Sequence, residues 1–382
     1  MRILHVIPSL ALCHGGPSVV LPIMERALSA EGIEVETITT DDEGPGRRNG
    51  KGDGFPREEN GIVRRYFPKQ TEFYKVSFPL AGWMKKHVKD YDVIHIHALF
   101  SHTSIAAARV ARRAGVPYVI RPLGVLNQYG VTQRRALLKQ LSLRWFDGPV
   151  LGRAAAVHFT LDAEREEAER LGIAFKPVVI PLGLEDVPLP DADPHVSPYV
   201  LYLSRIDPKK NLESLLEAWS RVHLTRPEWR LLIAGSGEAD YLAGLRKKAD
   251  SLGIAHSTEW AGEVSGEQKA GLLANAAIYT LPSHSENFGI AAAEALMAGK
   301  ACLFTPGVAI GVEAAKAGAA RLVDGEAEPL ADALSGLMGN PSLRDSLATA
   351  ARDFAATELS AGMMGRRLKD LYEKIIATGT AY

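Results

Sequence analysis

Short apolar runs rich in Val and Ile alternate along the chain with amphipathic stretches of helical periodicity. In the first half, these runs predict strands at residues 3–8, 35–40, 62–67, 92–98, 117–121, 156–160 and 177–181. Helical patterns lie between them, as over residues 18–32 and 104–115, and both of these end in a Gly that suits a helix C-terminus. This alternation is typical of βα units that build parallel sheets.

The second half repeats the alternation after a Pro- and Asp-rich stretch that has no apolar face. We interpret this stretch, residues 183–198, as an interdomain linker. Beyond it, the pattern predicts strands at residues 199–206, 229–237, 257–262, 278–283 and 301–306, with helices between them and a helical tail. We therefore expect an α/β protein with two doubly wound, Rossmann-like domains, residues 1–182 and 199–359, facing each other across a cleft.

Two segments depart from this pattern. Residues 41–60 are polar, rich in Gly and without periodicity, so we expect an exposed, mobile loop there. Residues 3–12 are apolar but lack the basic flank and the small-residue cleavage site of a signal peptide, so we expect a buried strand. No stretch approaches the roughly 18 apolar residues that a membrane span needs.

Composition places the chain among ordinary globular proteins. Its 382 residues are 46% hydrophobic and 23% charged, which excludes disorder and collagen-like repeats. The net charge of −1 argues against a nucleic-acid partner, which would require a basic excess. Because Cys13 and Cys302 are its two cysteines, we expect no disulfide framework and a reducing, cytoplasmic location.

Gly15 and Gly16 follow the first predicted strand and precede a helix. Such glycines let the backbone approach an anion at a helix N-terminus, and they suit an ordinary tight turn equally well. A nicotinamide dinucleotide site would need G-x-G-x-x-G, which is missing here, and after Gly235 the third glycine is replaced by Asp240. An NAD-dependent oxidoreductase therefore loses its main support.

Two further loops carry charged residues at expected strand ends. Arg205 and Lys210 lie in S-R-I-D-P-K-K-N, where they suit a diphosphate or are simply solvated loop cations. Glu286 and Glu294 lie in E-N-F-G-I-A-A-A-E and would be about 12 Å apart on a helix. That separation suits two ends of an elongated ligand better than the roughly 5 to 10 Å of a hydrolase pair, although Glu294 is also an ordinary helix former.

Together these motifs resemble the retaining glycosyltransferases of the GT-B fold, family 4, also called glycosyl transferases group 1. The matching features are Gly15–Gly16, the S-R-I-x-P-K-K-N loop, I-A-G-S-G at a strand end and the E-x7-E motif, in the family's order over nearly the whole chain. The resemblance implies a GT-B fold whose last helix, about residues 360–382, packs back on the first domain. It also implies a nucleotide-sugar donor as co-substrate, no cofactor and no metal.

The resemblance assigns a role to each candidate site residue. Glu286 would contact the donor sugar near the reacting carbon, and Glu294 would bind the nucleotide ribose. Arg205 and Lys210 would hold the diphosphate and stabilise the leaving group. The remaining donor contacts would come from Gly15, Gly16, Asn287, Phe288 and Gly289 around the phosphates, and from Gly235 and Val264 near the base.

The first half departs from the family after the strand that ends at Arg121. Where many members have a His near the anomeric carbon, this chain has Leu123, and we expect Arg121 and the Gly124 backbone to take its place. An H-x-H-x4-H pattern over residues 95–102 could suggest zinc, but no Cys or carboxylate joins it, so a cleft or core role is expected. His97, nearest the strand end, is the candidate catalytic residue.

The charge of the chain is uneven and bears on the acceptor. Residues 1–153 hold 22 Lys and Arg against 14 Asp and Glu, which suits a surface facing anionic lipid or a lipid-diphosphate acceptor. Residues 134–153 add an amphipathic pattern in which basic residues alternate with Leu, Trp145 and Phe146. The alternative is a helix packed on its own domain with a solvated basic face.

From these motifs we expect a metal-independent, retaining transferase that adds a sugar to a glycan or lipid-linked glycan in polysaccharide or glycolipid biosynthesis. A UDP-sugar is the first choice of donor and GDP-mannose the second. Two other classes stay open: a non-catalytic nucleotide-sugar-binding protein of the same fold, and a GT-B epimerase or phosphorylase. Peripheral contact with the cytoplasmic membrane face also stays open.

Overall fold

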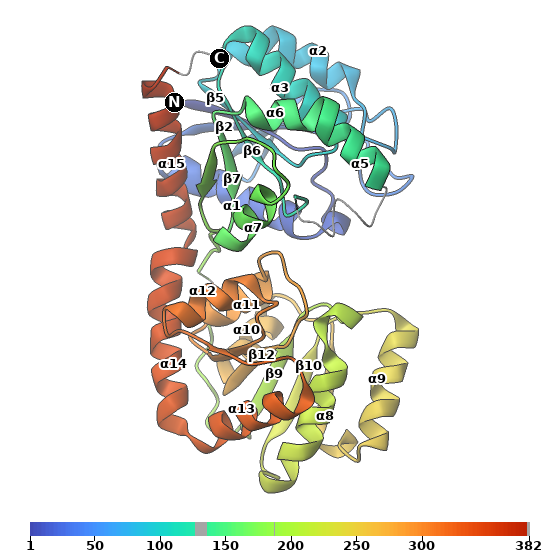
Figure 1. Cartoon of the computed structure of the whole chain (residues 1–382), viewed down its shortest axis with the longest axis vertical. Coiled ribbons are helices and arrows are strands. Elements are labelled where there is room, and N and C mark those ends of the chain that lie inside the picture. Colours follow the sequence, from blue (N-terminus) through green and yellow to red (C-terminus); the bar gives the residue numbers. More distant parts are fainter. Residues whose placement is uncertain (127–135, 187, 380–382) are drawn as a thin grey trace. The chain divides into compact units, whose positions relative to one another are not determined.

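The structure is a computed structural model of residues 1–382 that describes all of them except 127–135, 187 and 380–382. The chain divides into two compact units (Figure 1). The N-terminal unit comprises Met1–Gly183 and Ala361–Tyr382, and the C-terminal unit comprises Leu184–Ser360. The predicted linker therefore belongs almost wholly to the C-terminal unit.

The N-terminal unit is built on a sheet whose described strands have the order β3-β4-β2-β1-β5-β6-β7-β8. All neighbours in it are parallel except β3 and β4. The strands are β1 (Arg2–Val6), β2 (Glu34–Thr40), β3 (Pro56–Glu59), β4 (Ile62–Phe67), β5 (Val93–His97), β6 (Tyr118–Arg121), β7 (Ala156–Phe159) and β8 (Pro177–Val179). Every strand predicted for this half is present, and the expected parallel α/β architecture is confirmed.

Helices cover both faces of this sheet. They are α1 (Gly16–Ala30), α2 (Phe78–His87), α3 (His102–Ala114), α5 (Ala136–Ser142), the π-helical turn η3 (Leu143–Asp147), α6 (Gly148–Gly152) and α7 (Asp162–Glu169). The face covered by α2, α3 and α6 is apolar and includes Leu4, Ile96 and Ile120 (Figure 1). The opposite face, toward α1, buries an unusual number of polar side chains.

Residues 41–60 are mostly exposed, as the sequence predicted, but the segment is buried where it begins and forms a strand where it ends. Asp42 is 1% exposed, and its Oδ1 accepts hydrogen bonds from Lys69 Nζ and Lys75 Nζ, both at 2.5 Å. Burial alone would raise the pKa of Asp42, but the bonds from these lysines lower it well below the usual range. Strand β3, at the end of this segment, pairs antiparallel with β4. The prediction of an exposed segment therefore holds for most of these residues but fails at Asp41, Asp42 and Gly44, which are buried, Asp42 because lysines farther along the chain reach it.

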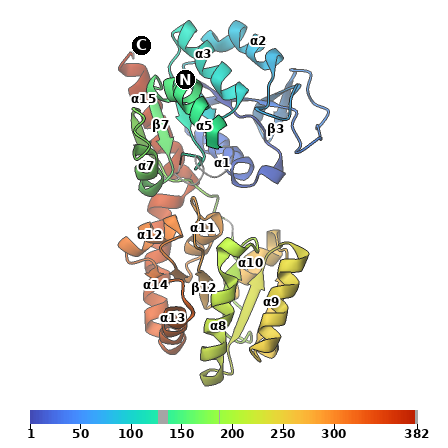
Figure 2. The ribbon, with the colours of Figure 1, turned by 45° about the vertical axis from the view of Figure 1, so that its right-hand side comes forward.

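The C-terminal unit carries a parallel sheet with the described strand order β11-β10-β9-β12-β13-β14. The strands are β9 (Tyr199–Leu203), β10 (Arg230–Ala234), β11 (Thr258–Gly262), β12 (Ile278–Leu281), β13 (Ala301–Phe304) and β14 (Arg321–Leu322). Its helices are α8 (Leu212–Val222), α9 (Ala239–Ser251), α10 (Gly266–Asn275), α11 (Ile290–Met297), α12 (Ala309–Lys316), α13 (Ala327–Gly339) and α14 (Pro341–Phe354). Figure 2 shows α8 beside α9.

The last helix, α15 (Ala361–Ala377), belongs to the N-terminal unit, where it packs against α1. The two helices approach closely at Gly365, since a Cβ there would lie 2.8 Å from the Ala27 carbonyl oxygen. Farther along α15, Tyr372 is fully buried and its hydroxyl lies 2.7 Å from His95 Nδ1. Within the described residues, no helix has the length and apolar character that a bilayer crossing requires.

Candidate functional site

The carboxyl ends of β9 and β12 mark the point where the strand order of the C-terminal sheet reverses. Strand β9 pairs with β10 on one side and with β12 on the other, so the connections that leave β9 and β12 diverge. Ligands of open α/β sheets bind in the crevice at such a point. The segment after β9 carries Arg205 and Lys210, and the segment after β12 carries Glu286. Two motifs about 80 residues apart in sequence thus meet at one sheet edge.

Lys210 and Glu286 form an ion pair across this point. Lys210 Nζ donates a hydrogen bond to Glu286 Oε1, and Ser283 Oγ donates to the same oxygen at 2.9 Å. Both charged side chains are largely buried, at 7% and 12% exposure. Burial lowers the pKa of Lys210, and the Glu286 carboxylate opposes that shift. Lys210 is therefore not the solvated loop cation of the alternative interpretation but an enclosed ammonium group held by a carboxylate.

Backbone contacts fix both partners of this pair. The Glu286 N–H donates to the Gly307 carbonyl at 2.7 Å, and the His284 N–H donates to the Lys209 carbonyl at 2.8 Å. The second bond joins the segment after β12 directly to the segment after β9. Asn211, which follows Lys210, has φ of 59°, a conformation that Asn tolerates better than most residues. The position of the ammonium group is therefore determined by the backbone on both sides.

Arg205 lies beside a cavity of about 300 Å³ between the segments that follow β9 and β10. Its side chain is exposed, and among the described residues no carboxylate forms an ion pair with it. A guanidinium group in this state can bind an anion in a bidentate manner, and it is equally a solvated cation. The cavity is lined by Arg205, Ile206, Asp207, Pro208, Ser236, Gly237, Glu238 and Tyr241.

Glycines at the end of β10 let neighbouring segments touch. Gly235 has φ of +147°, and a Cβ on it would lie 1.8 Å from the Ser204 carbonyl oxygen. Its N–H donates to the Gly262 carbonyl at 2.6 Å, and Gly237 is similarly crowded by backbone. Packing within the protein therefore accounts for Gly235 without a ligand. The predicted base contacts of Gly235 and of the half-buried Val264 stay predictions.

The start of α11 holds the other donor candidates. Gly289, with φ of +92°, caps the helix, while Phe288 is buried and Asn287 is exposed. Glu294 lies within α11, and its Oε1 accepts a hydrogen bond from Lys269 Nζ of α10 at 2.7 Å. The sequence analysis missed Lys269, because the pairing depends on how α10 packs beside α11. A ribose at Glu294 would have this ammonium group as a neighbour.

Gly15 and Gly16 open α1 at the carboxyl edge of the N-terminal sheet. Gly15 has φ of +77° and its N–H donates to the Leu12 carbonyl at 2.9 Å, which closes a turn. Gly16 is the first residue of α1, followed by Pro17. The tight-turn interpretation explains Gly15 by itself, and phosphate contact at this helix start stays a prediction.

His97 and Arg121 lie in the interior of the N-terminal unit. Strand register places His5 beside His95 and places His97 beside Arg121, all on the face that packs against α1. His5 Nδ1 and His97 Nε2 are 2.7 Å apart, and the exposure of His97 and Arg121 is 0% and 3%. For His97 this is the core position of the two that the sequence left open, and Arg121 lies in the same interior and not at the cleft expected for it. Successive side chains of a strand point to opposite faces of the sheet, and those of His97 and Arg121 point to the face covered by α1 and α15.

The sequence analysis missed two members of this buried cluster, His5 and His158. Burial, with the nearby Arg121 charge, lowers the pKa of each from 6.5 to about 3, so both imidazoles are neutral at physiological pH. On the same face, His95 contacts the Tyr372 hydroxyl. The available signal was a His at an inward-facing position of the strands predicted at residues 3–8 and 156–160.

The imidazoles of His5, His95 and His97 are close enough to be tested as a metal site. Each offers a nitrogen within 4.8 Å of the others, whereas His102 of the predicted pattern lies apart, at the start of α3. Charge opposes a metal ion here, because the guanidinium of Arg121 is buried beside the imidazoles and would repel a cation. The cluster gives no reason to add a metal to the site.

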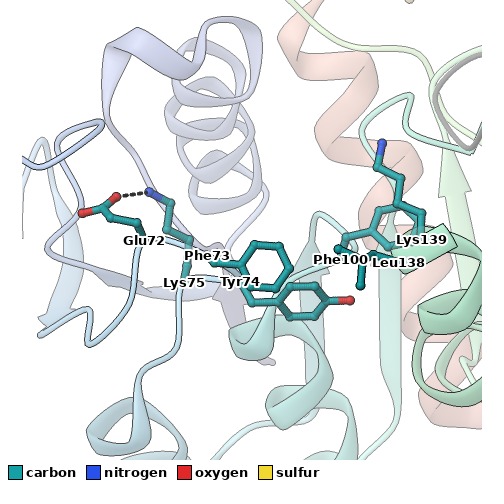
Figure 3. Close-up of a pocket in the computed structure, with 7 residues that line it drawn as sticks. All are labelled: Glu72, Phe73, Tyr74, Lys75, Phe100, Leu138 and Lys139. Carbon is teal, nitrogen blue, oxygen red and sulfur yellow. Dashed lines mark hydrogen bonds and ion pairs between the residues drawn. The ribbon is translucent and has the colours of Figure 1, made fainter. Parts of the chain in front are cut away.

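A cavity of about 440 Å³ lies at the carboxyl edge of the N-terminal sheet, among segments that follow β4 and β5 and the helix α5. It is lined by Glu72, Phe73, Tyr74, Lys75, Phe100, Leu138 and Lys139. Figure 3 shows the rings of Phe73 and Tyr74 directed toward Phe100 and Leu138, while Lys75 turns toward Glu72. The sequence analysis identified none of these aromatic residues, since the cavity is assembled from three separate segments of the chain.

Two family descriptions together match most of the chain. "Glycosyl transferases group 1" matches residues 192–354, and "Glycosyl transferase 4-like domain" matches residues 15–183. The chain is also 30% identical over 270 residues to the phosphatidyl-myo-inositol mannosyltransferase of Mycolicibacterium smegmatis, which covers 67% of this chain and 64% of that protein. Thus the match spans slightly less than two thirds of that relative.

Two further comparisons agree with these matches. The chain is 28% identical over 314 residues to the GDP-mannose:cellobiosyl-diphosphopolyprenol alpha-mannosyltransferase of Xanthomonas oryzae pv. oryzae, covering 78% of this chain and 77% of that protein. Among solved structures, Anabaena HepE in complex with UDP has a TM-score of 0.78 at 17% identity and covers 98% of this chain and 100% of that one. At that identity the structural likeness concerns the fold alone.

Proposed function

We propose, from the premise that this chain belongs to the glycosyl transferases group 1 family with the GT-B fold, that it is a retaining glycosyltransferase working without a metal. It transfers a sugar from a nucleotide-diphosphate sugar to a lipid-linked or glycan acceptor. The observation that carries this proposal is the meeting of Lys210, Glu286 and Arg205 at the point where the strand order of the C-terminal sheet reverses.

The charge at this point suits a departing diphosphate. As the bond between the anomeric carbon and the diphosphate oxygen breaks, its electron pair stays on that oxygen. The acceptor hydroxyl oxygen forms the new bond to the anomeric carbon, and its proton passes to the departing diphosphate. Lys210 is held in place by Glu286 and by the surrounding backbone, so little reorganisation is needed when the negative charge develops. Arg205 adds a second, exposed cation on the same segment. Lys210 and Arg205 then stabilise the negative charge on the departing diphosphate, as a divalent metal does in metal-dependent transferases.

Glu286 has a double role in this proposal. Without donor, its carboxylate neutralises Lys210; with donor bound, the diphosphate shares that ammonium group, and Glu286 faces the sugar near the reacting carbon. Positive charge grows on the anomeric carbon in the transition state, so a nearby carboxylate stabilises that state more than the bound donor. Glu294 binds the ribose, so its carboxylate accepts hydrogen bonds both from the ribose hydroxyls and from Lys269.

GDP-mannose is the first donor that we propose, with UDP-sugars second. This order reverses the expectation from the sequence, and the support comes from the two curated relatives above. Both are named mannosyltransferases, and the name of one includes GDP-mannose. Their names also contain a phosphatidyl lipid and a diphosphopolyprenol, which supports a lipid-linked acceptor.

Thermal unfolding in the presence of nucleotides tests the donor site. Binding to the folded state alone raises the melting temperature by mass action. We expect GDP and GDP-mannose to raise it, with the same result in EDTA and in magnesium. A larger rise with UDP compounds would restore the first expectation, a rise that needs magnesium would contradict the metal-free site, and no rise with any nucleotide would contradict the proposal.

Product analysis separates the transferase from its alternatives. Incubation with GDP-mannose and a lipid-diphosphate saccharide should give GDP and a product whose new linkage keeps the α configuration of the donor, visible by NMR. Isomerised nucleotide sugar without acceptor would indicate an epimerase, and cleavage by inorganic phosphate a phosphorylase. Donor binding without turnover on any acceptor would favour the non-catalytic binding protein.

A further inference from the structure

The helical segment formed by α5 and η3 presents apolar side chains to solvent. Leu137, Leu141 and Trp145 recur every four residues, and Leu138 lies beside Leu137. We call these four residues the stripe, and they are exposed: Leu137 77%, Leu138 52%, Leu141 53% and Trp145 63%. The sequence analysis left open a helix that packs on its own domain with a solvated basic face. Leu143, Val150 and Leu151 do pack on the core of the unit, so that alternative holds for part of the segment, but the stripe stays exposed. The buried side of the segment also includes the polar Ser142. A run of exposed large apolar residues on one helix face is typical of an interaction surface.

A polar network holds the segment in place without using the stripe. The Tyr74 hydroxyl and Ser142 Oγ are hydrogen-bonded to each other, and Ser142 Oγ donates to Asp147 Oδ2 at 2.5 Å. The Phe100 N–H donates to Asp147 Oδ1 at 3.1 Å, and Asp147 is fully buried. Because these inward groups anchor α5 and η3, the exposed leucines are not required for the fold of the unit.

The stripe borders the 440 Å³ cavity, and Leu138 belongs to both. Around this cavity the backbone is strained, since Tyr74, Lys75 and Phe100 have φ of 62°, 44° and 55°. For residues other than Gly, such a conformation costs about 1–3 kcal/mol, and residues of this kind cluster at functional sites. Three strained residues around one cavity indicate that its shape has a function. The cavity and the stripe adjoin at Leu138.

Basic side chains border the stripe. Residues 136–153 contain Lys139, Arg144 and Arg153, and their one acidic residue is the buried Asp147 of the polar network, while Glu72 lines the far side of the cavity. At the surface itself, Arg144 lies over the Trp145 ring and Lys139 over the Phe100 ring, each 5.5 Å from the ring centroid. Basic side chains beside exposed Leu and Trp are typical of segments that lie in the interface of a membrane.

We propose that the stripe and the adjoining cavity form a docking surface for an anionic lipid bilayer. The leucines enter the boundary between headgroups and acyl chains, Trp145 sits at headgroup depth, and Lys139 and Arg144 face the lipid phosphates. A second copy of this chain suits the surface less well, because self-association would bring like charges together. Docking opens the cavity toward the lipid phase, where a lipid-linked acceptor resides, and does not depend on which nucleotide sugar is used.

Sedimentation of the full chain with vesicles tests this docking. We expect binding to phosphatidylcholine vesicles that contain phosphatidylglycerol, little binding to phosphatidylcholine alone, and weaker binding as salt increases. The Leu137→Ser/Leu141→Ser variant should bind at least about tenfold more weakly, since two apolar side chains no longer enter the interface. The matched control is Leu224→Ser, because Leu224 is 75% exposed in the C-terminal unit and should not affect binding.

Tryptophan fluorescence gives a second, site-specific readout. Of the five tryptophans, Trp145 is the exposed one, whereas Trp219 and Trp229 are buried and Trp83 and Trp260 are partly so. We expect a blue shift of the emission on addition of phosphatidylglycerol vesicles and quenching by brominated acyl chains. The Trp145→Phe variant should lose the shift while it still sediments with vesicles.

Three outcomes would overturn the proposal: no binding of the wild-type chain to anionic vesicles, equal binding by the double variant, or unchanged Trp145 emission on binding. A concentration-dependent dimer that the double variant abolishes would also overturn it, in favour of a second copy. Melting temperature and nucleotide-induced stabilisation of each variant serve as folding controls. They also keep the result separate from the proposed donor chemistry, which concerns the other unit.

Discussion

Replacing Glu286 with Gln removes one negative charge and keeps a side chain of nearly the same shape. The Gln carbonyl can still accept the Ser283 hydroxyl, now 2.9 Å from Glu286 Oε1, and the Lys210 ammonium group. What is lost is the only carboxylate that forms an ion pair with Lys210 among the described residues. Hydrogen bonds to charged groups contribute about 1.5–3 kcal/mol and Gln retains part of that, so we expect a loss of roughly 1–2 kcal/mol in unfolding free energy.

The pKa of Lys210 should fall further in this variant. Burial already lowers it, the nearby Lys209 and Arg205 charges add to the effect, and Glu286 is what opposes them. A diphosphate is held by the protonated ammonium group, so its contribution to binding is lost as the pH rises through this pKa. Donor affinity should therefore begin to decline at a lower pH in Glu286→Gln than in the wild-type protein.

Turnover should decrease far more than donor affinity at neutral pH. A preorganised group aimed at charge that develops in the transition state is worth roughly 100- to 1,000-fold in kcat, whereas the ground-state donor gains much less from it. We expect kcat to fall about 100-fold and the donor Kd to change by less than about threefold. The assay combines nucleotide release under saturating acceptor with isothermal titration of the donor.

The comparison variant Ser283→Ala removes the 2.9 Å hydrogen bond to Glu286 but leaves the charge pair intact. It should cost about tenfold or less in kcat, the range of one neutral hydrogen bond. If Glu286→Gln weakened donor binding and kcat by the same factor, the carboxylate would serve binding in general and the transition-state role would be refuted. Circular dichroism at the assay temperature excludes unfolding as the cause.

Three further predictions concern the scaffold. Gly235→Ala should prevent stable folding of the C-terminal unit, because its Cβ would lie 1.8 Å from the Ser204 carbonyl oxygen. Gly244→Ala should instead stabilise this unit by about 0.5–1 kcal/mol, because a Cβ on Gly244 of α9 has no atom within 4 Å. Urea unfolding of both variants measures the two effects. Folding lowers the pKa values of His5 and His158 from 6.5 to about 3, so between these pH values the unfolded chain binds protons that the folded chain does not. The free energy of unfolding should therefore be highest above pH 6.5. As the pH drops toward 3, it should decrease by up to about 1.4 kcal/mol per pH unit for each group. Urea midpoints at pH 7, 6 and 5 test this sign, and an unchanged slope after His5→Gln would contradict it. Tyr372→Phe should cost about 1–3 kcal/mol, because a buried His95 nitrogen loses its partner at 2.7 Å; an unchanged midpoint would show that the bond contributes nothing.

The sequence predicted the strands well because each buried parallel strand is a short apolar run that carries its own signal. It failed where a structure depends on partners far away in the chain. Strand β3 lies within polar residues, and Asp42 nearby is buried only because Lys69 and Lys75 reach it. Strand β14 spans the two residues Arg321 and Leu322, too few for any periodicity.

The same distinction explains which of the predicted site residues the structure brings together. Lys210 and Glu286 each belong to a compact motif directly after a strand, and the reversal of strand order brings the two motifs together. The sequence could not tell that Lys210 would be enclosed while Arg205 stays exposed, because that depends on backbone bonds between the two segments. For His97 the sequence left a cleft and a core position open for a related reason: its place at a strand end was visible, but the face on which it lies is set by register with neighbouring strands.

The cavity of the N-terminal unit is harder to predict from sequence because it is assembled from separated segments. Tyr74, Phe100 and Leu138 meet at one cavity although each follows a different strand, and no short motif links them. The family matches cover this half of the chain as well, yet they assign no residue to it. Three features that are unusual for the surface of a folded unit identify this one: exposed leucines, residues with positive φ, and charged side chains that are mostly basic. Each feature lowers the stability or solubility of the protein, so their coincidence on one face argues for selection by a binding partner rather than by the fold.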